Sequence, residues 1–127
     1  AGRMRAFVLD TGALIAAEHR RLRMKRLLEL ARAETIALVV PGVCIAEWWR
    51  GRTDVRERIL SASIVDHGDD ALVKLAGEAQ ARVRASTAID AIVMATAARR
   101  GGMVLTSDVD DMQRLQTAFP DVRVLGV

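Results

Sequence analysis

Isolated acidic side chains are the feature of this sequence that points most directly to chemistry. Three of them are each the only charged residue of an apolar segment: Asp10 in residues 6–17, Glu47 in residues 35–49 and Asp90 in residues 86–98. A fourth, Asp108, follows the apolar run Met103–Leu105. A buried, unpaired carboxylate costs several kcal/mol, so a basic partner, a raised pKa or a bound cation must compensate it. One shared explanation is a hard divalent cation, Mg²⁺ or Mn²⁺, held by carboxylate oxygens.

Each acid also has a simpler interpretation that stays open. Asp10 could cap a helix that begins at Thr11, and Asp90 could cap the helix in which it lies. Glu47, expected in the middle of a helix, could pair with Arg50. Asp108 could serve the turn in which it lies. Neither histidine nor the cysteine falls in a zinc-binding spacing.

The elements that must position these acids are short apolar strands alternating with helices. We expect strands at residues 6–9, 36–40, 63–65, 103–105 and 122–125. Helices are expected at residues 11–18, 21–32, 43–50, 88–100, and from 110 or 111 to 118. Two more are expected, one capped by Asp54 and running through residue 62, and one capped by Asp69 or Asp70 and running to about residue 85. This alternation favours an α/β domain with a mostly parallel sheet covered on both faces. Sites in such sheets form beyond the carboxyl ends of the strands, where Asp10 and Asp108 are expected.

Composition indicates one globular domain over residues 1–127. Hydrophobic residues make up 51% of the chain, which is enough for a core, and no apolar run approaches the length of a membrane span. Residues 1–3 precede Met4, and we expect them to be a remnant of the expression vector. The absence of a secretory signal and the single Cys44, expected to be buried, favour the cytoplasm. The pI of about 10.0, carried mainly by arginine, favours a polyanionic partner.

Taken in order, these segments resemble the PIN-domain nucleases, and most closely the VapC-type toxins of type II toxin–antitoxin systems. The resemblance is carried by VLDTGALIA (8–16), CIAEWWRG (44–51), AIDAIVMATAARRGGMVLTSDVDDM (88–112) and the closing VRVLGV. It implies a three-layer α/β/α sandwich around a mostly parallel sheet of about five strands.

The resemblance also implies an activity, a site and partners. The activity is that of a metal-dependent endoribonuclease that cleaves RNA phosphodiesters by metal-activated water, with Mg²⁺ or Mn²⁺ as cofactor. The catalytic residues would be Asp10, Glu47, Asp90 and Asp108. Asp10, Asp90 and Asp108 would hold the metal, with Glu47 and either Asp110 or Asp111 as candidate further ligands, and with Thr11 and Ser107 in support. The partners would be the RNA substrate, a cognate antitoxin and a second copy of the chain.

A basic run and a tryptophan pair are candidate contact surfaces. The run comprises Arg20, Arg21, Arg23, Lys25 and Arg26. It is interpreted as a surface for RNA phosphates or for the antitoxin, or as a solvated helix face. Adjacent helix positions point about 100° apart, so one of Trp48 and Trp49 is expected in the core and the other at an interface.

Other classes of function fit less well. A haloacid-dehalogenase-like phosphatase needs a second aspartate two residues after the first, and Gly12 occupies that position. A phosphoacceptor receiver domain needs an acid pair after the first strand and a lysine at a strand end, and this sequence has neither. A non-catalytic binding module with an acidic pocket remains an alternative.

Overall fold

A parallel five-stranded sheet organises the chain, whose computed structural model describes residues 4–127. The strand order is β3-β2-β1-β4-β5, and every strand pair is parallel. The strands are β1 (Ala6–Leu9), β2 (Ala37–Pro41), β3 (Ile64–Asp66), β4 (Met103–Thr106) and β5 (Arg123–Gly126). The expected vector remnant, residues 1–3, lies outside the described residues.

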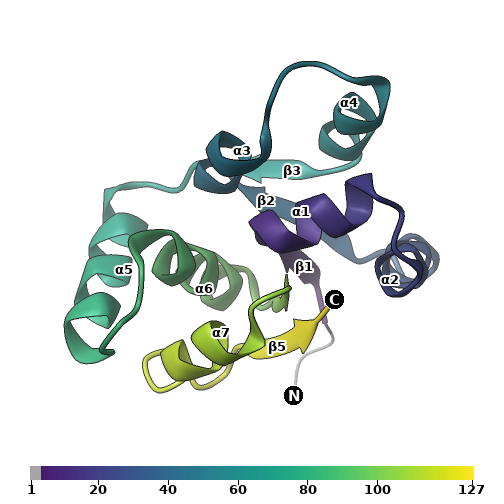
Figure 1. Ribbon diagram of the computed structural model, residues 1–127. Helices are drawn as coiled ribbons and strands as arrows, with labels where there is room; N and C mark the ends of the chain where they lie inside the picture. The colour runs from purple at the N-terminus through teal and green to yellow at the C-terminus, as the bar shows by residue number, and fades with distance from the viewer. Residues whose placement is uncertain (1–3) are drawn as a thin grey trace.

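Helices cover the sheet on both faces, as Figure 1 shows. Helix α1 packs against α2, α3 and α4, whereas α6 packs against α5 and α7. The helices are α1 (Thr11–Glu18), α2 (Leu22–Ala33), α3 (Gly42–Trp48), α4 (Asp54–Ser61), α5 (Asp70–Arg82), α6 (Ala88–Arg100) and α7 (Val109–Leu115). The expected three-layer α/β/α sandwich is confirmed, and its sheet is entirely parallel.

Local capping sets several helix ends. The helix expected to start with Asp54 as its cap is instead capped by Thr53, whose hydroxyl accepts a hydrogen bond from the Arg56 backbone amide. Asp69 caps α5, which settles the choice between Asp69 and Asp70. Gly101 ends α6 in the left-handed conformation, with a φ of 62°. Helix α3 ends at Trp48, two residues before the predicted end, and α7 ends at Leu115 rather than Ala118.

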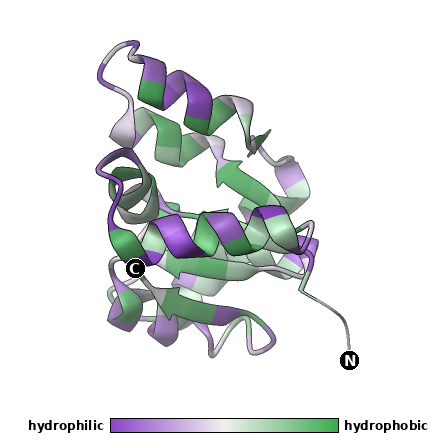
Figure 2. Cartoon of the chain, turned by 90° about the vertical axis from the view of Figure 1, so that its right-hand side faces the viewer, coloured by the Kyte–Doolittle hydropathy of each residue, from purple (hydrophilic) through white to green (hydrophobic). Residues whose placement is uncertain are grey.

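The core lies on both sides of the central strands. The central strands are mainly hydrophobic in Figure 2, while the helices alternate hydrophobic and hydrophilic positions. Val8, Leu9 and Leu105 are completely buried, as is Met94 of α6. The buried state of Cys44 is confirmed, and burial raises the pKa of its thiol to about 12. Among residues 4–127, no helix is long and apolar enough to cross a membrane.

Candidate functional site

Asp10 lies at the carboxyl end of β1, where it caps α1. Its backbone amide donates to the Leu105 carbonyl at 3.2 Å, and its Oδ1 accepts from the Ala13 amide at 2.8 Å. The expected capping role is therefore present, although the side chain is 7% exposed and has no basic partner among residues 4–127. Burial raises the pKa of Asp10, hydrogen bonding with Thr106 and the Ala13 amide opposes this, and the charge of Asp108 raises it further.

Asp90 occupies the first turn of α6 but does not cap it. The cap is Thr87, whose Oγ1 accepts from the Asp90 amide at 3.2 Å, so the interpretation of Asp90 as a cap is wrong. Burial raises the pKa of the Asp90 carboxyl despite the opposing hydrogen bond with Thr87. The charges of Asp111, Asp10 and Glu47 raise it further. The charges that act on half-buried Asp90 are therefore those of other acids, and no basic side chain among them neutralises it.

Glu47 differs from its predicted environment, because it is exposed and lies in the last turn of α3 rather than in the middle of a buried helix. The alternative of a salt bridge to Arg50 is also wrong. The Arg50 guanidinium donates to the Ala46 and Trp49 carbonyls, at 3.3 and 2.8 Å. Glu47 Oε1 instead accepts a hydrogen bond from Thr11 Oγ1 at 2.6 Å, which joins α3 to the start of α1. This contact turns Glu47 toward the residue next to Asp10.

Asp108 is exposed and follows β4, so it stands at the same edge of the sheet as Asp10. Its backbone amide donates to Thr106 Oγ1 at 2.8 Å, which fixes the turn. A hydrogen bond between the Asp108 and Asp111 carboxyl groups raises the pKa of Asp108, with burial and the charges of Asp111 and Asp90 adding to it. The same contact lowers the pKa of Asp111, which also pairs with Arg114. Asp111, rather than Asp110, is therefore the neighbour that interacts with this group.

Two residues near the acids were not predicted to matter. Gly12 lies so close to the turn after β4 that a Cβ atom placed on it would be 1.8 Å from Ser107 Oγ. The glycine thus allows Ser107 to pack against the start of α1. Thr106, completely buried, hydrogen-bonds with Asp10 and with the Asp108 amide. Its position as the last residue of a strand before Ser-Asp was the available signal.

The acidic side chains at this edge of the sheet are of the type that binds a hard divalent cation. Asp10, Glu47, Asp90 and Asp108 supply only oxygen ligands, and none forms an ion pair with a basic side chain of residues 4–127. The charge of Asp108 raises the pKa of Asp10. The charges of Asp10, Glu47 and Asp111 raise the pKa of Asp90. Within that same part of the chain, however, no three acidic, imidazole or thiol groups are close enough to hold a metal ion as they stand. Closure around one ion would require the exposed carboxylates to turn inward.

The other expected contact residues lie on surfaces. The basic run Arg20, Arg21, Arg23, Lys25 and Arg26 is exposed on α2 and the turn before it. No member of the run pairs with a carboxylate of residues 4–127. Of the two tryptophans, Trp48 is buried and Trp49 is half-buried, so the prediction that one belongs to the core is confirmed.

Solved structures share this fold at low sequence identity. The crystal structure of VapBC2 from Rickettsia felis, bound to a promoter DNA fragment, is 13% identical with a TM-score of 0.76, over 96% of this chain and 98% of that one. DNA-bound VapBC from Salmonella typhimurium is 18% identical with a TM-score of 0.72, over 97% and 98%. FitAcB from Neisseria gonorrhoeae is 17% identical with a TM-score of 0.61, over 94% and 96%.

These structures show the fold, whereas the family of the chain follows from its sequence. No curated protein sequence shows a significant match. The family model described as PIN domain matches residues 7–117, which include all of the acids discussed above. The chain therefore belongs to the PIN domain family.

Proposed function

We propose that this protein is an endoribonuclease dependent on Mg²⁺ or Mn²⁺. PIN domain proteins are in general nucleases that use divalent metals. The observation that carries the proposal is the group of carboxylates at the carboxyl edge of the sheet. Asp10, Glu47, Asp90 and Asp108 form no ion pair with a basic side chain of residues 4–127. The pKa values of Asp10, Asp90 and Asp108 are raised in part by their neighbours' charges. Such mutual repulsion favours binding of a cation.

In this proposal, Asp10, Asp90 and Asp108 hold the metal, with Glu47 and Asp111 as further ligands. A bound divalent ion would neutralise these charges, lower the pKa of a water molecule and stabilise the leaving oxygen of the phosphodiester. The carboxylates must be ionised to bind it, so protons compete with the metal at acid pH.

The surrounding residues orient the carboxylates. The 2.6 Å hydrogen bond from Thr11 to Glu47 holds the α3 carboxylate beside the start of α1. Thr106 connects Asp10 to the turn that carries Asp108. Ser107, which packs against Gly12, places a hydroxyl at the same edge. These contacts reduce the rearrangement that is needed when an ion binds.

The basic run is the proposed contact for RNA phosphates. Its side chains are exposed, and no carboxylate of residues 4–127 neutralises them. If several of them contact phosphates, the logarithm of the RNA affinity should fall linearly with the logarithm of salt concentration. The expected slope is about −0.7 for each phosphate neutralised on a single strand. A flat salt dependence would contradict this role.

We further propose that the protein is the toxin of a toxin–antitoxin pair and that it forms a homodimer. The VapBC and FitAB complexes with DNA are its structural neighbours. Exposed apolar side chains support a protein partner for the first two helices, with Ile15 41%, Leu22 60% and Leu30 45% exposed. Half-buried Trp49 is the residue proposed for a dimer contact. Light scattering of the purified chain, alone and with its co-expressed antitoxin, tests both assemblies.

The nuclease proposal is tested by RNA cleavage in Mg²⁺ and in EDTA. Asp10→Asn and Asp90→Asn should abolish cleavage, because each replaces a charged ligand by an amide of similar shape. Asp70→Asn, an exposed aspartate in the first turn of α5, is the matched control and should cleave normally. Undiminished cleavage in EDTA would contradict the metal dependence. Metal binding without cleavage of any RNA would favour the alternative of a non-catalytic acidic pocket, whereas PIN membership leaves the phosphatase alternative without support.

A further inference from the structure

A pocket rich in arginine lies at the opposite edge of the sheet from the acids. It has a volume of about 540 Å³ and is lined mainly by Arg5, Arg99, Arg100, Arg123 and the Gly101–Gly102 turn. Arg5 precedes β1 and Asp10 follows it, so the strand separates their Cα atoms by about 16 Å at 3.3 Å per residue. The pocket is therefore not part of the acidic site.

Guanidinium groups from three parts of the chain dominate the charge of this pocket. Arg5 precedes β1, Arg99 and Arg100 end α6, and Arg123 begins β5. Asp121 is the single carboxylate of the lining. The negative end of the α6 dipole accounts for basic residues at positions 99 and 100. It does not account for Arg5, which precedes β1, or for Arg123, which begins β5.

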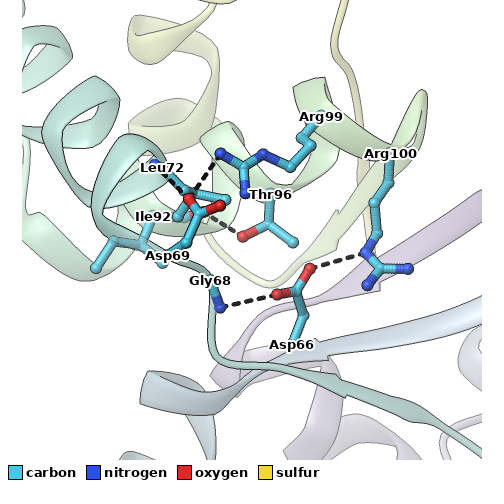
Figure 3. A network of polar contacts seen from close by, with 8 residues as sticks. All are labelled: Asp66, Gly68, Asp69, Leu72, Ile92, Thr96, Arg99 and Arg100. Atoms are coloured by element: carbon cyan, nitrogen blue, oxygen red, sulfur yellow. Dashed lines mark hydrogen bonds and ion pairs between the residues drawn. The ribbon is translucent and has the colours of Figure 1, made fainter.

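Two of these arginines are already anchored, as Figure 3 shows. Arg100 donates through Nε to Asp66 Oδ2 at 2.8 Å, and Arg99 donates through one terminal nitrogen to Asp69 Oδ1 at 2.9 Å. Both terminal nitrogens of Arg100 remain without a hydrogen-bond acceptor among residues 4–127. An anchored guanidinium loses little further conformational entropy when its free N–H groups bind a ligand.

The remaining two arginines supply uncompensated charge. Neither Arg5 nor Arg123 forms an ion pair with a carboxylate of residues 4–127. Guanidinium groups bind phosphate oxygens through paired N–H donors. The volume of about 540 Å³ falls within the range of small-ligand pockets.

We propose that this pocket is a phosphate-binding site, separate from the acidic edge and independent of the proposed nuclease activity. Its ligand is a phosphate group, presented either by a free phosphate compound or by a polynucleotide backbone. Arg5 and Arg123 provide the net positive charge, and Arg100 provides a pre-positioned donor. The opposing charge of Asp121 limits the affinity.

Calorimetric titration with inorganic phosphate at low ionic strength tests the proposal. The double variant Arg5→Gln/Arg123→Gln should bind phosphate at least about tenfold more weakly, because it loses two charged donors. Asp121→Asn should bind it more tightly, because one repulsive charge is removed. The matched control Arg32→Gln/Arg84→Gln removes the same charge from exposed positions outside the pocket and should bind as the unaltered protein does.

The source of the phosphate is distinguished by a second titration with single-stranded RNA in the Asp10→Asn background. If the Arg5/Arg123 variant weakens binding of both RNA and inorganic phosphate, the site serves a polynucleotide. If it weakens only inorganic phosphate, the site serves free phosphate compounds. Equal phosphate affinity in the double variant and the control would overturn the site. The Asp10→Asn background leaves this pocket intact, so the result does not depend on whether the acids form a nuclease centre.

Discussion

Glu18 connects three helices on one face of the sheet, and its removal should destabilise the protein measurably. It lies in the last turn of α1, and its side chain is 19% exposed. Its Oε1 accepts a hydrogen bond from the Trp48 indole at 2.9 Å, and its Oε2 lies 2.9 Å from Arg56 Nε. That N–H has no acceptor in line with it among residues 4–127, so the contact with Arg56 is an ion pair rather than a directed hydrogen bond. Through these contacts α1 holds α3 and α4.

The loss of stability in Glu18→Ala can be estimated from the two groups, on Trp48 and Arg56, that would lose their partner. The Trp48 side chain is almost completely buried, so its indole N–H would lose a charged acceptor, at a cost of about 1.5–3 kcal/mol. Arg56, 18% exposed, would lose its counter-charge, and partial solvation limits that loss to about 1 kcal/mol. Together these lower the free energy of unfolding by about 3 kcal/mol, or roughly 10 °C in melting temperature. Glu18→Gln keeps an oxygen acceptor for Trp48 and should lose only about 1 kcal/mol.

Urea unfolding followed by tryptophan fluorescence and by circular dichroism measures these differences. The matched control is Glu29→Ala, which removes the same side chain from an exposed position of α2 and should stay within about 0.5 kcal/mol of the unaltered protein. The reasoning would be refuted if Glu18→Ala were no less stable than Glu29→Ala. It would also be refuted if Glu18→Gln and Glu18→Ala were equally destabilised.

Three further changes test the acid edge and the helix contacts. The pKa of Asp90 is raised in the folded protein, so its ionised form opposes folding above the pKa of the unfolded chain. In the absence of metal, Asp90→Asn should therefore raise the melting temperature at pH 7 but not at pH 3. The same variant should be stabilised less by Mn²⁺ than the unaltered protein is. Gly12→Ala should cost about 1–3 kcal/mol in chemical denaturation, because its Cβ would displace Ser107. Burial raises the pKa of Asp66, but hydrogen bonds from Arg100 and Gly68 outweigh this and lower the pKa overall. The ionised carboxylate therefore stabilises the fold above the pKa of the unfolded chain. Asp66→Asn should lower the melting temperature at pH 7 but much less at pH 3.

The sequence predicted the elements well where local signals act alone. Apolar runs and helix periodicity located every strand and helix, including the short edge strand β3. The errors lie at ends, because a cap depends on one side-chain contact: Thr53 rather than Asp54 caps α4, and Thr87 rather than Asp90 caps α6.

The acid edge was predictable in part. Asp10 and Asp108 could be assigned to one edge because both follow strands of a parallel sheet. The exposure of Glu47 could not, since it depends on the direction in which the last turn of α3 faces. Contacts such as that of Thr11 with Glu47 join residues 36 positions apart and follow from helix packing, which no local pattern encodes.

The central claim is that these carboxylates share a divalent ion, and a crystal structure of the protein soaked in Mn²⁺, with anomalous scattering at the manganese edge, tests it most directly. The account predicts an ion ligated by Asp10 together with Asp90 or Asp108, with the exposed carboxylates turned inward from their present positions. An empty edge at saturating Mn²⁺, with these acids bonded to basic side chains of the protein instead, would contradict it.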